Sequence, residues 1–70
     1  MNKTWEPLIW GNERLIYDAM ASMNNRGGSI VAITNFHHKF KRSKVKIAIQ
    51  GLETKGLVKY NNTLQEYTLV

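Results

Sequence analysis

The chain has 70 residues, and its ten Lys and Arg residues outnumber five Asp and Glu, which gives a formal net charge of +5 and a pI of about 9.8. This length allows one small domain with a small core, and the absence of cysteine excludes disulfides, Cys-ligated zinc and thiol chemistry. Because no apolar run is long enough to span a membrane and the first residues lack the apolar stretch of a signal peptide, we expect a cytoplasmic protein with no membrane partner.

Residues 1–11 are apolar but show no clear helical or strand period. Four residues make this segment too apolar for a free tail: Trp5, Leu8, Ile9 and Trp10. We expect it to lie against the domain or against a partner, either a second copy of the chain or another protein. Residues 12–70 are expected to form the folded domain.

A first helix is predicted over residues 12–25. Asn12 is a suitable N-cap, and Glu13 follows in the first turn, where a negative charge is favourable. An apolar stripe at helical spacing marks the buried face, and Leu15 is expected to widen it. The stripe consists of Ile16, Ala19, Met20 and Met23. Residues 24–28, with one basic residue and two glycines, end the helix.

Residues 29–31 are predicted as a brief extended segment, and a second helix follows over residues 32–38. This helix is expected to bury Ile33 together with Phe36 or His37. Phe40 then lies in a turn before the third helix.

The third helix is predicted over residues 43–55, with Ser43 as its N-cap. The basic Lys55 followed by Gly56, which can adopt a left-handed conformation, is the signal that ends it. It carries two rows of residues at i, i+3, i+4 and i+7 spacing on different faces. The first row is apolar and suits a core: Val45, Ala48, Ile49 and Leu52. The second row is mixed and suits a surface that contacts a ligand: Ser43, Lys46, Ile47 and Gln50. Gly51 costs such a helix about 1 kcal/mol relative to Ala, and the sequence offers no reason for it.

Residues 57–70 are predicted as a β-hairpin. With residues 61–64 as the loop, the predicted pairs are Val58 with Tyr67, Lys59 with Glu66 and Tyr60 with Gln65. This register places apolar residues opposite each other and a positive charge opposite a negative one. A two-residue Asn-Asn loop is less favourable, because it sets Leu57 opposite Glu66.

The charges of this chain are segregated along the sequence. No acidic residue lies between Asp18 and Glu53, an interval with six basic residues. One is Arg26, and the others fall within residues 39–46: Lys39, Lys41, Arg42, Lys44 and Lys46. A one-sign cluster on a small basic domain indicates an anionic partner, most commonly nucleic acid. A solvated surface rich in lysine is the simpler alternative.

No catalytic or metal site is expected. His37 and His38 are adjacent, so on a helix they point about 100° apart and cannot bind one ion as an i, i+4 pair does. Asp18 is the only Asp, and no glycine-rich phosphate motif leads into a helix. We therefore expect a protein that is not an enzyme and needs no cofactor.

The predicted order of helix, extended segment, helix, turn, helix and hairpin resembles the winged helix-turn-helix domain, a mainly α fold of three helices with a small β-hairpin. Residues 40–46 (FKRSKVK) and 52–58 (LETKGLV) resemble the recognition helix and first wing strand of MarR-type regulators. The resemblance is strong over residues 40–58 and looser over 12–39. The extra terminal helices that build the dimer and the effector pocket of MarR-type proteins are not expected here.

The resemblance implies a sequence-specific double-stranded DNA-binding protein, a small transcriptional or replication regulator of the phage or mobile-element type, located at the nucleoid when bound. Helix 43–55 would enter the major groove and hairpin 57–70 would form the wing. The residues implied in DNA binding are Lys39, Lys41, Arg42, Ser43, Lys44, Lys46, Ile47, Gln50, Asn61 and Asn62.

Two other functions are open alternatives. A winged-helix adaptor subunit of a nucleic-acid-processing complex would bind a protein through the apolar first residues, with Trp5 and Trp10. A protein that binds RNA or single-stranded DNA would interleave exposed aromatic residues with basic ones. Apart from Phe40, that pattern is absent from the basic stretch.

Overall fold

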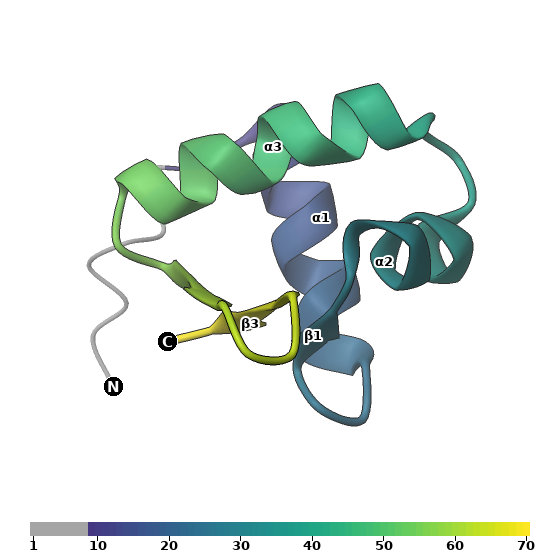
Figure 1. Cartoon of the computed structure of the whole chain (residues 1–70). Helices are drawn as coiled ribbons and strands as arrows, with labels where there is room; N and C mark the ends of the chain where they lie inside the picture. Colours follow the sequence, from purple (N-terminus) through teal and green to yellow (C-terminus); the bar gives the residue numbers. More distant parts are fainter. Residues whose placement is uncertain (1–8) are drawn as a thin grey trace.

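The computed structural model describes residues 9–70, and this part of the chain forms three helices and three short strands. In chain order they are α1 (Gly11–Ser22), β1 (Gly27–Gly28), α2 (Ile30–His37), α3 (Arg42–Thr54), β2 (Val58–Asn61) and β3 (Glu66–Leu69). The strands form one antiparallel sheet in the order β1-β3-β2. The fold is mainly α and winged-helix-like, with the hairpin at the C-terminal end, as the predicted order of elements indicated (Figure 1).

The core lies where the three helices meet the sheet. Helix α3 runs along one side of the molecule, and α1 and α2 lie beneath it in Figure 1. The buried apolar residues are Ile9, Ile16, Met20, Ile33, Val45, Ala48, Ile49, Leu52, Val58 and Leu69. They include all four residues of the apolar row predicted for α3, which we call its inner row. No described polar or charged side chain is buried with them. None of the helices in residues 9–70 is long and apolar enough to cross a bilayer.

Helix α1 has different ends from those predicted. It starts at residue 11 and stops at residue 22. The two glycines that were predicted to end the helix lie further along the chain and form β1. The prediction of Asn12 as the N-cap is wrong, because Trp10 occupies that position and no side chain caps the helix. Asn12 therefore lies in the first turn with its side chain exposed.

The buried stripe of α1 is narrower than predicted and is extended from outside the helix. Ile16 and Met20 are fully buried, whereas Leu15 is 49% exposed and does not widen the stripe. Ile9, just before the helix, is 3% exposed and belongs to the core. The segment preceding α1 thus contributes to the fold at Ile9; Trp5 and Leu8, predicted to act with it, lie outside the described residues.

The prediction of residues 29–31 as the extended segment is wrong, because strand β1 consists of the two glycines that precede them. Gly27 pairs with Thr68, and Gly28 pairs with Tyr67 of β3. Gly27 has φ +151°, and a Cβ atom there would overlap the carbonyl oxygen of Tyr67 and lie 2.9 Å from the Thr68 Cα. Only glycine permits this approach of the two backbones.

Helix α2 begins two residues earlier than predicted because Ser29 caps it. The Ser29 hydroxyl oxygen accepts a hydrogen bond from the Ala32 N–H at 3.1 Å. Ile33 is fully buried, as expected. Of the two alternatives beside it, His37 is half-buried whereas Phe36 is 48% exposed, so His37 is the residue that turns towards the domain.

Helix α3 begins at Arg42, with Lys41 at the N-cap and no side-chain cap. The prediction of Ser43 as the cap is therefore wrong: Ser43 lies inside the first turn and is exposed. The first amide groups of α3 consequently have no side-chain acceptor within the helix.

The C-terminal end of α3 follows the prediction. Gly56 has φ +78°, and its N–H donates to the Glu53 carbonyl at 2.9 Å. The Leu57 N–H donates to the Leu52 carbonyl at 3.0 Å. These two bonds form a Schellman motif, which ends the helix and directs the chain into β2.

The hairpin has the predicted loop length but a different register. The pairs are Val58 with Leu69, Lys59 with Thr68, Tyr60 with Tyr67 and Asn61 with Glu66, so the loop is 62–65. The predicted register is therefore wrong by two residues, a shift that keeps each side chain on its predicted face of the sheet.

Two interactions favour the observed register, a hydrogen bond within the loop and a ring contact across the strands. The Asn61 side-chain oxygen accepts a hydrogen bond from the Leu64 N–H at 3.0 Å, and Gln65 adopts φ +54° before the chain enters β3. Across the strands, the rings of Tyr60 and Tyr67 lie 4.7 Å apart between centroids. The predicted register would have separated these rings.

The substitution Leu52→Ala should lower the free energy of unfolding by about 2–5 kcal/mol, because it removes a fully buried side chain from the centre of the core. Urea denaturation followed by circular dichroism measures this loss. Ile47→Ala, at a position of α3 that is 66% exposed, is the matched control and should change stability by no more than about 0.5 kcal/mol. Equal effects of the two substitutions would contradict the orientation of α3.

Gly27→Ala should be severely destabilising, because the added methyl group collides with the backbone of β3. Gly56→Ala provides the comparison, since Gly56 also has a positive φ but no atom within 4 Å of an added Cβ. It should cost only the strain of the left-handed conformation, about 1–2 kcal/mol. Thermal denaturation that finds the two variants equally stable would exclude the close approach of β1 to β3.

Candidate nucleic-acid interface

The mixed row of α3 lies on the outside of the molecule, and we call it the outer row. Ser43, Lys46, Ile47 and Gln50 are all exposed, and Ile47 is 66% exposed despite its apolar side chain. The inner row of the same helix is buried, so the orientation of α3 about its axis is fixed. The structure thus presents these four residues together along one exposed face of α3.

The basic residues of the segment 39–46 gather at the N-terminal end of α3. Lys39 and Lys41 lie in the turn between α2 and α3, and Arg42, Lys44 and Lys46 lie in the first turns of the helix. All five are exposed, and none forms an ion pair with another described residue. The positive end of the helix dipole adds to their field, so this end of α3 is strongly electropositive.

The turn that carries these cations is held by aromatic packing. The rings of His37 and Phe40 stack with centroids 4.8 Å apart, and Phe40 packs against the core. His38 adopts φ +47° and its N–H donates to the Thr34 carbonyl at 2.7 Å. Among residues 9–70, no group of three His, Asp or Glu side chains is placed to bind a metal ion.

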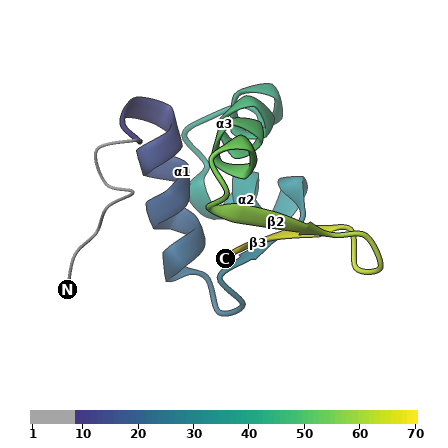
Figure 2. The ribbon, with the colours of Figure 1, turned by 90° about the vertical axis from the view of Figure 1, so that its left-hand side faces the viewer.

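Two predicted parts of the basic and polar surface lie away from this cluster. Arg26 belongs to the loop between α1 and β1, which Figures 1 and 2 show at the end of the molecule opposite α3. Asn61 and Asn62 lie at the tip of the hairpin, which projects beyond the helices in Figure 2. The two asparagines are exposed, and the side-chain oxygen of Asn61 already accepts a hydrogen bond from the Leu64 N–H.

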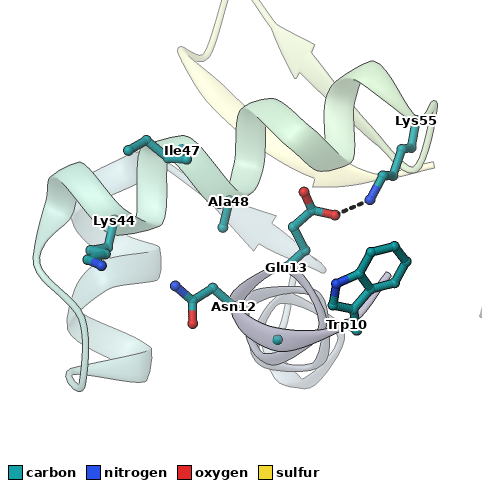
Figure 3. A pocket seen from close by; sticks show the side chains of 8 residues that line it. Trp10, Asn12, Glu13, Lys44, Ile47, Ala48 and Lys55 are labelled. Carbon is teal, nitrogen blue, oxygen red and sulfur yellow. Dashed lines mark hydrogen bonds and ion pairs between the residues drawn. The ribbon is translucent and has the colours of Figure 1, made fainter. Parts of the chain in front are cut away.

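A hollow of about 470 Å³ lies between the start of α1 and α3, and the sequence patterns did not predict it (Figure 3). It is lined by Trp10, Gly11, Asn12, Glu13, Lys44, Ile47, Ala48 and Lys55. We call it the α1–α3 hollow. Trp10, 69% exposed, and Ile47 give it an apolar rim, and Lys44 is shared with the basic cluster.

The end of the hollow at the C-terminal half of α3 is closed by an ion pair. The Lys55 ammonium group donates to the Glu13 carboxylate, and it also lies 5.1 Å from the centroid of the Trp10 ring. A Cβ atom on Gly51 would overlap the Glu13 carboxylate. The glycine in the middle of α3 therefore makes room for the Glu13 side chain, a reason that only the tertiary structure reveals.

Comparisons with known proteins identify no relative: no protein-family model, no curated protein and no solved structure matches this chain. The winged-helix-like description rests on the order of the elements and the topology of the sheet. Because one fold can serve several functions, a function for this protein has to be argued from the surface of α3 and its surroundings.

The contact between Gly51 and Glu13 predicts a coupling between two substitutions. Gly51→Ala alone should be nearly neutral, because a gain of about 1 kcal/mol in helix propensity is offset by displacement of the Glu13 side chain. In a Glu13→Ala background, the same substitution should stabilise the protein by about 1 kcal/mol. Thermal denaturation of the four proteins measures the coupling, and equal effects in both backgrounds would rule out the contact.

Proposed function

We propose that this protein binds double-stranded DNA in a sequence-specific manner, as a small regulator of transcription or replication with a recognition helix of the MarR type. The observation that carries the proposal is the exposed face of α3. There, a row of mixed polar and apolar side chains adjoins five cations that no described acidic residue neutralises. A phosphate backbone is the partner that such a distribution of charge fits best.

The outer row of α3 supports direct contact with bases. A helix with its side chains is about 10–12 Å across, close to the width of about 12 Å of the major groove. In this proposal Gln50 pairs with an adenine edge, Lys46 reaches the acceptors of guanine, and Ile47 contacts a thymine methyl group. The exposure of Ile47 supports its role, because an apolar side chain at the centre of a charged surface gains from meeting an apolar group.

The surroundings of this row support contacts to phosphate. Lys39, Lys41, Arg42 and Lys44 would neutralise phosphates beside the groove, which gives affinity without sequence information. The Ser43 hydroxyl and the uncapped amide groups at the start of α3 offer further donors for a phosphate oxygen. Asn61 and Asn62 at the tip of the wing carry no charge, so their contribution should be modest.

A protein-binding adaptor is the second candidate, and the exposed indole of Trp10 favours it. The two functions are distinguished by amide chemical shifts of the labelled protein during titration with duplex DNA. Shifts concentrated on residues 39–50 support DNA binding through α3. Shifts confined to residues 1–11, or no shifts, would favour the adaptor.

The affinity for duplex DNA should fall steeply with salt. Neutralisation of about four phosphates predicts a slope of log affinity against log salt near −3.6. Lys41→Ala should weaken binding to all duplexes and flatten this slope by about one unit. Arg26→Asn removes one charge at the opposite end of the molecule, at a residue with φ +57° that Asn tolerates, and should leave the slope unchanged. Fluorescence anisotropy at several salt concentrations measures both, and equal effects would indicate cations that only solubilise the protein.

Gln50→Ala should affect sequence preference and not the salt dependence. Loss of a bidentate contact should relax discrimination at one base pair by about 1–3 kcal/mol, while the salt slope stays near its original value. Selection of bound duplexes from a random library, followed by sequencing, compares the preferences of the two proteins. Identical preferences would exclude Gln50 as a base-contacting residue.

A further inference from the structure

We infer that the α1–α3 hollow binds the sugar–phosphate backbone of one DNA strand, alongside the base-contacting row of α3. The inference rests on the proposed function and extends it, because it makes the start of α1 a second DNA-contacting element. Asn12 and Trp10 are the residues it adds, and Lys44 is the cation they share with the basic cluster.

The hollow follows from one row of α3. Lys44, Ala48 and Gly51 of α3 and its C-cap Lys55 recur at i, i+4, i+7 and i+11. Three of them line the hollow and Gly51 faces Glu13, so the row lies along the side of α3 that faces the start of α1. The two residues at the centre of this row are the smallest available, and lysines stand at both ends. Small residues leave the space open, and the lysines place positive charge at its limits.

The position of this row relative to the outer row points to a DNA strand as the occupant. In a helix that lies in the major groove, the outward row meets base edges, and the rows on either side meet the two sugar–phosphate backbones. The hollow lies on one such side, since Ile47 belongs to the outer row and also forms its rim. A strand that follows the groove therefore passes over the hollow.

The two ends of the hollow differ in their free charge. At one end Lys55 is engaged by Glu13 and lies over the Trp10 ring, so its charge is largely compensated. At the other end Lys44 forms no ion pair with a described residue, and the Asn12 side chain lies on the same side of the hollow in Figure 3. A phosphate group is expected at this second end, with Lys44 as the cation and the Asn12 amide as a donor.

The rest of the hollow suits the sugar of the same strand. Trp10 is 69% exposed and Ile47 is 66% exposed, so both present apolar surface to the solvent at the rim. The volume of about 470 Å³ lies within the range of pockets that hold small ligands, which leaves room for a nucleotide unit. The indole N–H of Trp10 adds one hydrogen-bond donor to this part of the rim. Apart from Phe40, the basic stretch itself contains no interleaved aromatic residue; the fold places Trp10, the N-cap of α1, in the same hollow as Lys44.

The test uses a change of charge that should not disturb folding. Asn12→Asp keeps the shape of the side chain and adds a negative charge in the first turn of α1, where it is favourable for the helix. It should weaken binding to a fluorescein-labelled duplex by about fivefold, as expected for one unit charge some 4 Å from a phosphate in water. Asn25→Asp makes the same change in the loop between α1 and β1, at the far end of the molecule, and should weaken binding by less than about twofold.

A second measurement reports on the hollow directly. The indole N–H signal of Trp10, assigned by its absence in Trp10→Phe, should shift when the duplex is added to the full chain. Support requires both this shift and the larger effect of Asn12→Asp. If Asn12→Asp and Asn25→Asp weaken binding equally and the indole signal does not move, while Lys41→Ala does weaken binding, the inference is overturned and the proposed function stands. If the unaltered protein does not bind duplex DNA, both are overturned.

Discussion

The packing of the inner row of α3 against α1 and α2 is the interaction on which the rest of the molecule depends. Val45, Ile49 and Leu52 have no exposed surface, and Ala48 is 3% exposed. Because successive residues of a helix turn by about 100°, a fixed inner row determines which residues face outward. The exposed row that we propose for base contact is therefore set by the core and not by any interaction of its own.

The same periodicity explains how much of the fold was predictable. An apolar row at i, i+3, i+4 and i+7 identified α3 and its buried face, and the helix-ending signal of Lys55 and Gly56 was correct. Helix starts were less predictable. Asn12 and Ser43 are both good capping residues by type, yet each lies inside its first turn, because the chain preceding the helix decides where the first turn begins.

The hairpin register shows why pairing rules alone were insufficient. Placing Lys59 opposite Glu66 gives an exposed ion pair, worth at most about 1 kcal/mol. The observed register exchanges it for contact between the rings of Tyr60 and Tyr67 and for a loop stabilised by the Asn61 side chain. Contacts of this kind are each comparable in energy with the ion pair, and together they outweigh it.

The site was predictable where it is local and unpredictable where it is not. The basic cluster and the outer row of α3 are contiguous in sequence, so spacing alone brought them together. The α1–α3 hollow joins residues that are distant in sequence, such as Glu13 and Lys55, which are 42 positions apart. No local periodicity predicts such a contact. The unexplained Gly51 was the one sequence signal of it, since a glycine inside a helix often marks a close approach by another part of the chain.

The start of α3 is locally unfavourable in a way that supports a function for it. Lys41 occupies the N-cap without providing an acceptor, and Arg42 and Lys44 follow where the helix dipole favours negative charge. With Lys39 and Lys46 nearby, these cations also repel one another. A sequence selected only for stability would place a capping residue and acidic side chains at this position. Local rules are commonly broken in this way at functional sites, and a phosphate group bound at the start of α3 would supply both the missing acceptor and the missing negative charge.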